Sequence, residues 1–374
     1  MFSYWEKTHF FKYDLIVVGA GFVGLSTAIH YQVANPEATV LVLERGVFPS
    51  GASTKNAGFA CFGSLTEILD DLTHMSKDEV LGLVERRYNG LKAIRKQFGD
   101  KRLGYSHFFG YELIDDRQLG ALVRLSEINE FLYPVFQDDV FSLVQKPAAM
   151  GFSDQVKAVV KNKFEGELDP GRYMNSLWEL AHRAGIRILT GVSVKELLRE
   201  EGKVLAEGAD QVHLEFKAKK IALCTNAFTK KLWTAPDLQP GRGLILLSKP
   251  LDFDIPWNGS FHLDRGYVYF RQLAGRLLLG GGRNIDLEGE CSMDFSVNPK
   301  IKLHLEGLAR EVIFPNRKME WEMEWTGIMA FGKIKSPIIQ QVDDKTAVAV
   351  RLGGMGVAIG WQVGKELSLV LSKM

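Results

Sequence analysis

Short apolar runs and helix-like segments alternate along the first 45 residues of this 374-residue chain. Residues 13–18 form a β-branched apolar run, and residues 39–43 form a second one. Apolar runs this short and this continuous are typical of strands buried on both faces. Between them, residues 25–32 have helical spacing, and Asn35-Pro36 interrupts that spacing. The pattern therefore predicts a strand–helix–strand unit, which parallel sheets contain.

Helical patterns continue through the middle of the chain. Ser76-Lys-Asp-Glu79 has the form of a capping box, and apolar residues follow it at helical spacing as far as Ile94. A second helix is expected over about 121–133, where Pro134 ends it, because proline cannot continue an interior helix. Further elements follow in the order helix, strand, strand, strand, at about 173–184, 187–189, 194–198 and 220–225.

From residue 241 to residue 282 the pattern changes to short alternating strands separated by turn residues, which favours an antiparallel sheet. The last 30 residues again show the pattern of the N-terminal segment: an apolar strand, the glycine-rich loop 353–356 and a terminal helix. The predicted fold is therefore α/β (α+β overall): a Rossmann-like dinucleotide-binding domain and a second, mostly antiparallel β domain that binds substrate. We assign residues 1–80, 150–235 and 325–374 to the first domain and residues 81–149 and 236–324 to the second.

Composition narrows the possible partners and location. The chain has 46 basic and 45 acidic residues, a net charge of +1, and no basic run, so neither nucleic acid nor an acidic membrane is an expected partner. No apolar stretch reaches the ~20 residues that span a bilayer. The three cysteines are far apart, which favours a reducing compartment and predicts a soluble, cytoplasmic protein. The histidines show no metal-ligand spacing, so no metal site is predicted.

The turn after the first strand carries the clearest chemical signal. Gly19, Gly21 and Gly24 form a G-x-G-x-x-G pattern between a strand and a helix, and Glu44 ends the second strand. In this setting Gly19 allows the tight turn, Gly21 lets backbone approach a pyrophosphate, and Gly24 brings helix and strand together. The Glu44 carboxylate can accept hydrogen bonds from a ribose. This unit predicts a dinucleotide but does not separate FAD from NAD.

The segments that follow resemble the D-amino-acid oxidase/glycine oxidase superfamily of FAD-dependent oxidoreductases. Gly51-Ala-Ser-Thr-Lys-Asn-Ala-Gly58 resembles the family's flavin loop, and Gly166–Pro170 resembles its entry to the third FAD segment. Leu223–Phe228 resembles its strand end beside the cofactor. Trp325-Thr-Gly327 and Gly353–Gly356 resemble its C-terminal flavin segment. Because five segments match in order along nearly the whole chain, the resemblance implies FAD as the cofactor.

The resemblance also implies which residues bind FAD. The pyrophosphate would lie on the glycine-rich turn, the adenosine end at Glu44 and Arg45, and the adenine beside the backbone of Val194. Gly354, Met355 and Gly356 would direct backbone N–H groups and a helix N-terminus at the flavin N1/O2 edge. The full implied set is Gly19, Ala20, Gly21, Phe22, Val23, Gly24, Glu44, Arg45, Ser53, Lys55, Asn56, Ala57, Gly58, Val194, Thr225, Asn226, Gly354, Met355 and Gly356.

One departure concerns the substrate. Amino-acid-oxidising relatives commonly have an arginine that binds the substrate carboxylate where this chain has Met329, and methionine has no guanidinium fork. This favours an amine substrate unless Arg271 or another basic residue substitutes. The segments 266–271 and 276–281 resemble the γ-glutamylputrescine oxidase-like amine oxidases. Tyr267 and Tyr269, which alternate on one strand, and Lys55 in the flavin loop are further candidates for the catalytic site, with packing or phosphate-contact roles as alternatives.

The resulting prediction is an FAD-dependent oxidoreductase that oxidises a C–N bond by hydride transfer to flavin N5 and yields an imine. No cysteine lies beyond Cys291, so the FAD is expected to be non-covalent. A NAD-dependent dehydrogenase and a non-catalytic flavin-binding protein are the alternatives. The substrate, the electron acceptor and the oligomeric state stay open.

Overall fold

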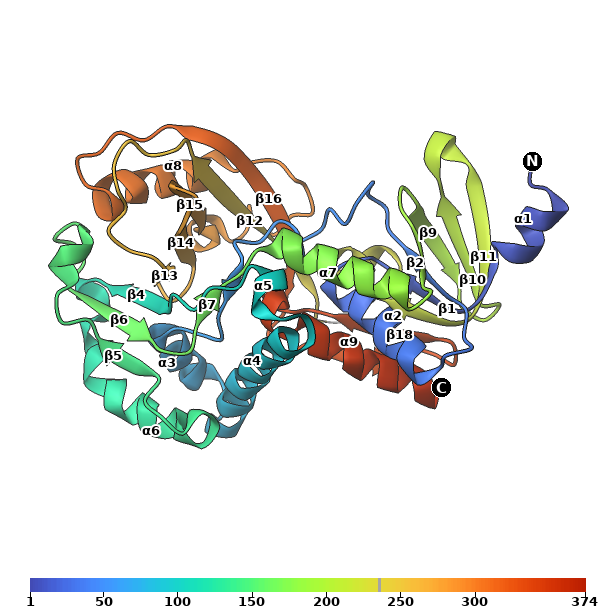
Figure 1. Cartoon of the computed structure of the whole chain (residues 1–374), viewed down its shortest axis with the longest axis horizontal. Helices are drawn as coiled ribbons and strands as arrows, with labels where there is room; N and C mark the ends of the chain where they lie inside the picture. Colours follow the sequence, from blue (N-terminus) through green and yellow to red (C-terminus); the bar gives the residue numbers. More distant parts are fainter. Residues whose placement is uncertain (235–236) are drawn as a thin grey trace.

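The computed structural model describes residues 1–234 and 237–374, which form two lobes, each built on an eight-stranded sheet (Figure 1). Six strands of the first sheet run in the order β17-β18-β11-β1-β2-β8, and β10 and β9 continue antiparallel from β11. These strands are β1 (Lys12–Val18), β2 (Val40–Leu43), β8 (Arg187–Leu189), β9 (Ser193–Leu198), β10 (Lys203–Glu207), β11 (His213–Leu223), β17 (Ile338–Gln341) and β18 (Thr346–Val350).

The second sheet has the order β16-β12-β15-β14-β13-β4-β6-β5, and all of its strand pairs are antiparallel except β13 with β4. Its strands are β4 (Gly110–Ile114), β5 (Phe141–Leu143), β6 (Ala158–Asn162), β12 (Gln239–Ser248), β13 (Ser260–Leu263), β14 (Val268–Leu273), β15 (Arg276–Gly281) and β16 (Trp321–Phe331). A small sheet pairs β3 (Phe59–Ala60) with β7 (Gly166–Glu167) between the lobes. The predicted α/β fold with a mostly antiparallel second domain is confirmed.

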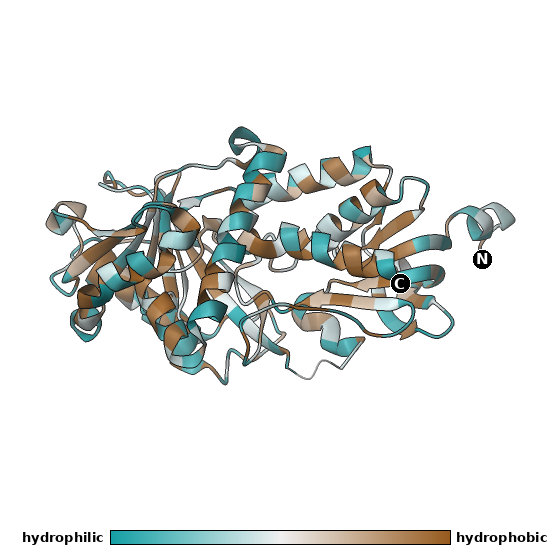
Figure 2. Ribbon diagram, turned by 90° about the horizontal axis from the view of Figure 1, so that it is seen from below, coloured by the Kyte–Doolittle hydropathy of each residue, from teal (hydrophilic) through white to brown (hydrophobic). Residues whose placement is uncertain are grey.

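Helices cover both sheets. They are α1 (Tyr4–His9), α2 (Phe22–Ala34), α3 (Leu65–His74), α4 (Lys77–Phe98), α5 (Asp100–Leu103), α6 (Leu125–Phe136), α7 (Pro170–Arg183), α8 (Pro299–Leu308) and α9 (Gly356–Lys373). Helix α1 buries no residue and projects from one end of the molecule (Figures 1 and 2). Among the described residues, no helix combines the length and the apolar character needed to cross a bilayer.

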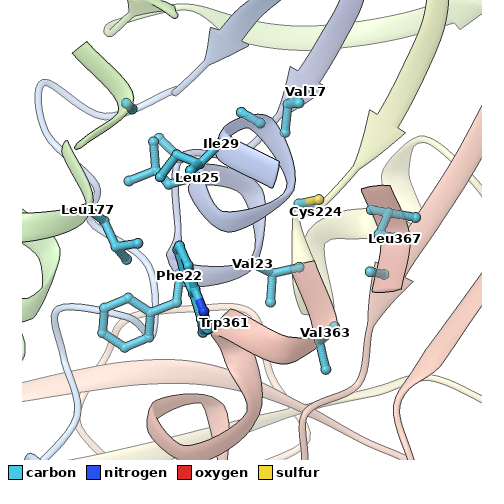
Figure 3. Packing of buried hydrophobic residues seen from close by; sticks show 14 of the residues in the cluster. Val17, Phe22, Val23, Leu25, Ile29, Leu177, Cys224, Trp361, Val363 and Leu367 are labelled. Atoms are coloured by element: carbon cyan, nitrogen blue, oxygen red, sulfur yellow. The ribbon is translucent and has the colours of Figure 1, made fainter. Parts of the chain in front are cut away.

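The predicted strand–helix–strand unit is β1-α2-β2. Strand β1 pairs in parallel with β2 on one side and with β11 on the other, so it lies inside the sheet. Its Leu15, Ile16 and Val17 have no exposed surface. Helix α2 lies between β1 and the helices α7 and α9, where its Phe22 and Leu25 pack with residues such as Trp361 (Figure 3). This packing places the N-terminus of α2 at the carboxyl ends of the central strands.

Two helix predictions had different outcomes. Ser76 caps α4 through a capping box with Glu79, as the sequence predicts. The prediction that Pro134 ends its helix is wrong, because α6 continues to Phe136. Proline removes only one backbone donor in this last turn, and the turn buries Phe136 in an apolar cluster with Leu132, which offsets the loss.

The predicted division into domains stays a proposal, and two strands bear on its boundaries. Strand β6 was assigned to the nucleotide-binding domain, but it pairs with β4 and β5 in the second sheet. Strand β16 also lies in the second sheet, paired with β12, although its Ile328 and Ala330 pack into the core of the first lobe. Strand β6 therefore belongs with the second sheet, whereas β16 connects the two lobes.

Candidate active site

A cavity of about 230 Å³ lies where β1, β2 and β11 end and where α2 and α9 begin. Most of the residues predicted to bind FAD line it. They are Gly19, Gly21, Phe22, Val23, Glu44, Arg45, Ser53, Asn56, Val194, Thr225, Asn226, Gly354 and Gly356. Segments from both ends of the chain thus meet in one cavity, as a discontinuous nucleotide-binding domain requires.

The walls of this first cavity suit a pyrophosphate and a flavin. The N-cap residues of α2 and α9, Gly21 and Met355, make no side-chain cap hydrogen bond, so both helix N-termini can receive an anionic group, although in α2 the N–H of Phe22 is already engaged. Backbone N–H of Phe22 donates to Ser53 Oγ at 3.0 Å, which joins the glycine-rich turn to the flavin loop. A Cβ at Gly21 would lie 2.9 Å from Ser53 Oγ, so a side chain there would close this approach.

The buried Glu44, which was predicted to bind the ribose, lies in the wall of the first cavity. Its Oε2 accepts from the N–H of Ala20 and its Oε1 from that of Gly46, both at 3.0 Å. These bonds hold the carboxylate at the cavity wall as an acceptor. The guanidinium of Arg45 lies 3.8 Å from the centre of the Phe228 ring, which positions this cation beside the same end of the cavity.

Three of the predicted FAD residues do not line a cavity. Ala20 holds Glu44 through its N–H, and Gly24 packs so closely that a Cβ there would lie 1.8 Å from the carbonyl oxygen of Gly19. Gly58 has a positive φ of 77° and donates its N–H to Asn56 Oδ1, which shapes the flavin loop. These three residues therefore fix the position of groups that line the first cavity.

A second cavity, of about 260 Å³, adjoins the first. The two share Ala52, Asn56, Met329, Gly354 and Val357. Aromatic rings contribute much of the second cavity's wall, and Phe59 and Tyr269 contact edge to face at 5.6 Å. A ligand in the first cavity that extended past Asn56 and Met329 would therefore meet one bound in the second.

Of the predicted catalytic residues, Lys55, Tyr267, Tyr269 and Met329 line the second cavity. Burial raises the pKa of Tyr269 to about 12, so its hydroxyl keeps its proton at neutral pH and can donate a hydrogen bond. Met329 lines both cavities. It occupies the sequence position at which the resemblance implies a carboxylate-binding arginine in amino-acid-oxidising relatives.

Arg271 is not among the residues that line either cavity. It is buried, its Nη1 lies 3.4 Å from Glu167 Oε2, and it donates to the carbonyl oxygen of Leu168. Burial lowers the pKa of Arg271 and raises that of Glu167, and each partner counteracts the other's shift. The suggestion that Arg271 replaces the missing arginine is therefore not supported by its position; it joins β14 to the small β3–β7 sheet.

Basic side chains dominate the charge of the second cavity. Arg87 pairs with Glu67 at 3.2 Å, Arg265 with Asp70 at 3.1 Å, Arg351 with Asp237 at 2.6 Å, and Lys335 with Asp71. Within residues 1–234 and 237–374, the two remaining cations of the wall, Lys55 and Arg283, have no carboxylate within ion-pair distance. The cavity thus has two positive charges that its own walls do not neutralise.

Sequence reasoning missed Arg283, which follows the end of β15. Its guanidinium lies over the Phe331 ring at 3.9 Å and near the Tyr267 ring at 5.3 Å, and burial lowers its pKa. Phe331 is two residues beyond Met329 on the same strand. The sequence predicts that the strand ends near Gly280–Gly282, but no local pattern indicates that the side chain of the next residue, Arg283, lines a cavity.

The comparisons with known proteins agree with this geometry. The DAO family, described as FAD dependent oxidoreductase, matches residues 14–368 of the chain. The chain belongs to this family. Its cofactor is accordingly FAD, the NAD-dependent alternative is not supported, and the superfamily predicted from the motifs is confirmed.

Relatives within the family differ in length and in similarity. A 4-methylaminobutanoate oxidase (formaldehyde-forming) of Paenarthrobacter nicotinovorans is 26% identical over 270 residues, which are 71% of this chain and 31% of that protein. The chain thus spans about a third of that relative's length. Glycine oxidase from Geobacillus kaustophilus has a TM-score of 0.76 at 16% identity, over 97% of this chain and 95% of that one. Iminodiacetate oxidase from Chelativorans sp. has a TM-score of 0.71 at 21% identity, over 96% and 95%. These structures show the same fold.

Proposed function

We propose that this protein is an FAD-dependent oxidoreductase that oxidises the C–N bond of an amine that also carries a carboxylate or a similar anion. The observation that carries this proposal is the second cavity, which adjoins the cofactor cavity and contains the unneutralised cations Arg283 and Lys55. Arg283 is half-buried, so a guanidinium there without a counter-charge is partly desolvated, and an anionic substrate would supply the missing charge. The 4-methylaminobutanoate, glycine and iminodiacetate named for the relatives all combine an amine with a carboxylate.

In this proposal the chain's residues bind and orient the substrate. FAD, when bound, would supply the hydride acceptor for the carbon beside the nitrogen. The amine loses a proton as the imine forms, and water then hydrolyses the imine to a carbonyl compound and an amine. Arg283 would hold the anionic end, while Tyr269 and Phe59 would exclude water from the reacting carbon. The N–H groups at the start of α9 would stabilise negative charge at the N1/O2 edge.

Several finer predictions go with this proposal. FAD would be bound without a covalent link, since Cys61, Cys224 and Cys291 all precede the C-terminal flavin segment. The roles of the individual cavity residues and the division into domains are part of the proposal. A cytoplasmic location also stays a prediction.

An anaerobic reduction assay tests the proposal with two matched amines. 4-Methylaminobutanoate and N-methylbutylamine share a secondary amine and a four-carbon chain, and differ in that a carboxylate replaces a methyl group. We expect the flavin absorbance to bleach with the first about tenfold more efficiently than with the second, since an ion pair to a half-buried cation contributes about 1.4 kcal/mol. Equal bleaching would contradict the anionic substrate. No bleaching across a broad panel of amines and amino acids would contradict C–N oxidation and would favour a non-catalytic flavin-binding protein.

A further inference from the structure

Three side chains of metal-ligand type meet beside the second cavity. Cys61 follows β3, Glu165 precedes β7, and His262 lies in β13. The Cys61 sulfur, one Glu165 carboxylate oxygen and one His262 ring nitrogen all lie within 4.8 Å of one another. All three residues are buried, with exposed fractions of 7%, 1% and 5%. The oxidation proposed above does not use any of them.

Strand pairing explains why these residues meet. In the β3–β7 pair Phe59 lies opposite Glu167 and Ala60 opposite Gly166, so the next residues outward, Cys61 and Glu165, face each other. On the other side, a Cβ at Gly110 would lie 2.1 Å from Glu165 Oε2. Glycine at that position therefore makes room for the Glu165 carboxylate beneath β4 and β13.

Glu165 is oriented by the backbone. Its Oε1 accepts from the N–H groups of Phe62 and Gly63, at 2.9 and 3.2 Å. Its Oε2 faces His262 Nε2 at 3.7 Å. Hydrogen bonds that fix a carboxylate in this way are a usual feature of metal ligands, because they orient the free oxygen.

The imidazole of His262 is incompletely satisfied. In the described part of the chain its Nε2 has no hydrogen-bond partner, although the side chain is buried, and 3.7 Å to Glu165 is too long for a hydrogen bond. A zinc ion with bonds of about 2.0–2.1 Å to nitrogen and oxygen separates two tetrahedral ligands by roughly 3.3 Å. A shift of a few tenths of an ångström would therefore let one ion satisfy both atoms.

Charge and ligand type select the ion. A thiolate and a carboxylate together neutralise a divalent cation, which removes the cost of burying either charge alone. Sulfur and imidazole ligands favour Zn²⁺ over Mg²⁺ or Ca²⁺.

We propose that Cys61, Glu165 and His262 bind one Zn²⁺, with a water molecule as its fourth ligand. Cys61 and His262 line the second cavity, so the open position faces that cavity. Three protein ligands and one exchangeable position are typical of zinc sites that contact a substrate, whereas structural sites use four protein ligands. The ion would also join the segments beside the β3–β7 pair, which contain Cys61 and Glu165, to β13 of the second sheet.

Metal analysis of the FAD-loaded protein tests the site. The protein is prepared without a metal-binding tag, and its zinc content is measured by mass spectrometry after gel filtration. A second sample is treated with a chelator, dialysed against zinc sulfate and measured in the same way. We expect about one zinc per chain, falling at least about tenfold in Cys61→Ser and in His262→Gln. Cys291→Ser is the matched control, since Cys291 is exposed and is not one of the three clustered residues, and this variant should keep its zinc.

X-ray absorption at the zinc edge identifies the ligands. One sulfur at about 2.3 Å and nitrogen or oxygen ligands at about 2.0–2.1 Å would support the site. A protein that contains no zinc and takes up none from zinc sulfate would overturn the proposal. Undiminished zinc in both Cys61→Ser and His262→Gln would overturn it too. The FAD content and unfolding temperature of each variant show whether it folds, and neither zinc readout depends on which amine is oxidised.

Discussion

The two adjoining cavities are built on different principles. The wall of the first includes a glycine-rich turn, two helix N-termini whose N-cap side chains make no cap hydrogen bond, and a loop of small residues, together with side chains such as those of Arg45 and Phe228. The wall of the second consists of aromatic rings and long charged side chains from both lobes. The first cavity therefore depends on how closely backbone segments approach, and the second on which charges are paired. Substitutions should separate these two dependences.

The largest effect is expected where backbone approach is closest. In Gly24→Ala the new methyl group would overlap the carbonyl of Gly19, and neither backbone segment can move without disturbing β1 and α2. We expect the variant to lose more than about 4 kcal/mol of unfolding free energy and to retain little FAD. Thermal unfolding and the ratio of flavin to protein absorbance measure both effects.

Gly82→Ala is the matched control for that substitution. Gly82 lies within α4, and a Cβ there meets no atom within 4 Å. This variant should be more stable by up to about 1 kcal/mol, because alanine is the better helix former. If Gly24→Ala were as stable as Gly82→Ala, close backbone approach would not be what builds the first cavity.

A large effect on stability alone is expected at Arg271. In Arg271→Met the half-buried Glu167 loses its counter-charge, which should cost about 3 kcal/mol of unfolding free energy. KM for the substrate should stay unchanged, because Arg271 does not line the second cavity. The exposed pair Arg310–Glu311 provides the control, and Arg310→Met should change stability by less than about 1 kcal/mol. A higher KM in Arg271→Met would place this arginine in the substrate site after all.

Arg283 is expected to show the opposite behaviour. Arg283→Met should lower kcat/KM for 4-methylaminobutanoate by roughly 30-fold to several thousand-fold. This factor corresponds to a loss of about 2–5 kcal/mol of transition-state stabilisation. The same variant should oxidise N-methylbutylamine as the unmodified protein does, and Arg283→Lys should recover part of the loss. Steady-state kinetics with the two amines form a cycle that isolates the charge interaction. Equal losses for both amines would mean that Arg283 only shapes the cavity.

The smallest effect concerns the junction of β1 and β2. A hydrogen-bonded ion pair with Lys219 and hydrogen bonds from Thr39 lower the pKa of Asp14 from 3.8 to about 2. A lowered pKa adds stability above pH 3.8, and this stability is lost as the pH falls toward 2. Asp14→Asn should therefore cost about 1 kcal/mol at pH 7, after allowing for solvent screening, and the difference should shrink as the pH approaches 3. Urea unfolding at several pH values checks this, with the exposed Asp154→Asn as control.

Much of the first lobe was predictable because its signals are local. The glycine-rich turn, the apolar runs of β1 and β2 and the Ser76 capping box each lie within a few residues of the structure that they specify. Most of the predicted FAD residues line one cavity for the same reason. The error at Pro134 arose where a local rule, the helix-ending effect of proline, competed with burial of Phe136.

The substrate cavity could not be predicted in the same way. Tyr267 and Tyr269 were identified from strand alternation, and both line the second cavity. The same reasoning favoured Arg271 and missed Arg283, because alternation shows that side chains share a face but not what lies opposite that face. Glu167, which pairs with Arg271, is more than 100 residues away in the chain.

The sequence by itself determined the strand–helix–strand unit, the family and the cofactor, since each rests on residues that are neighbours in the chain. Tertiary structure alone decided which cations have no carboxylate partner among the described residues, and it brought Cys61, Glu165 and His262 together from three separate segments. The physical reason is that backbone geometry depends on local residue types, whereas the pairing of charges and ligands depends on how distant strands come into register.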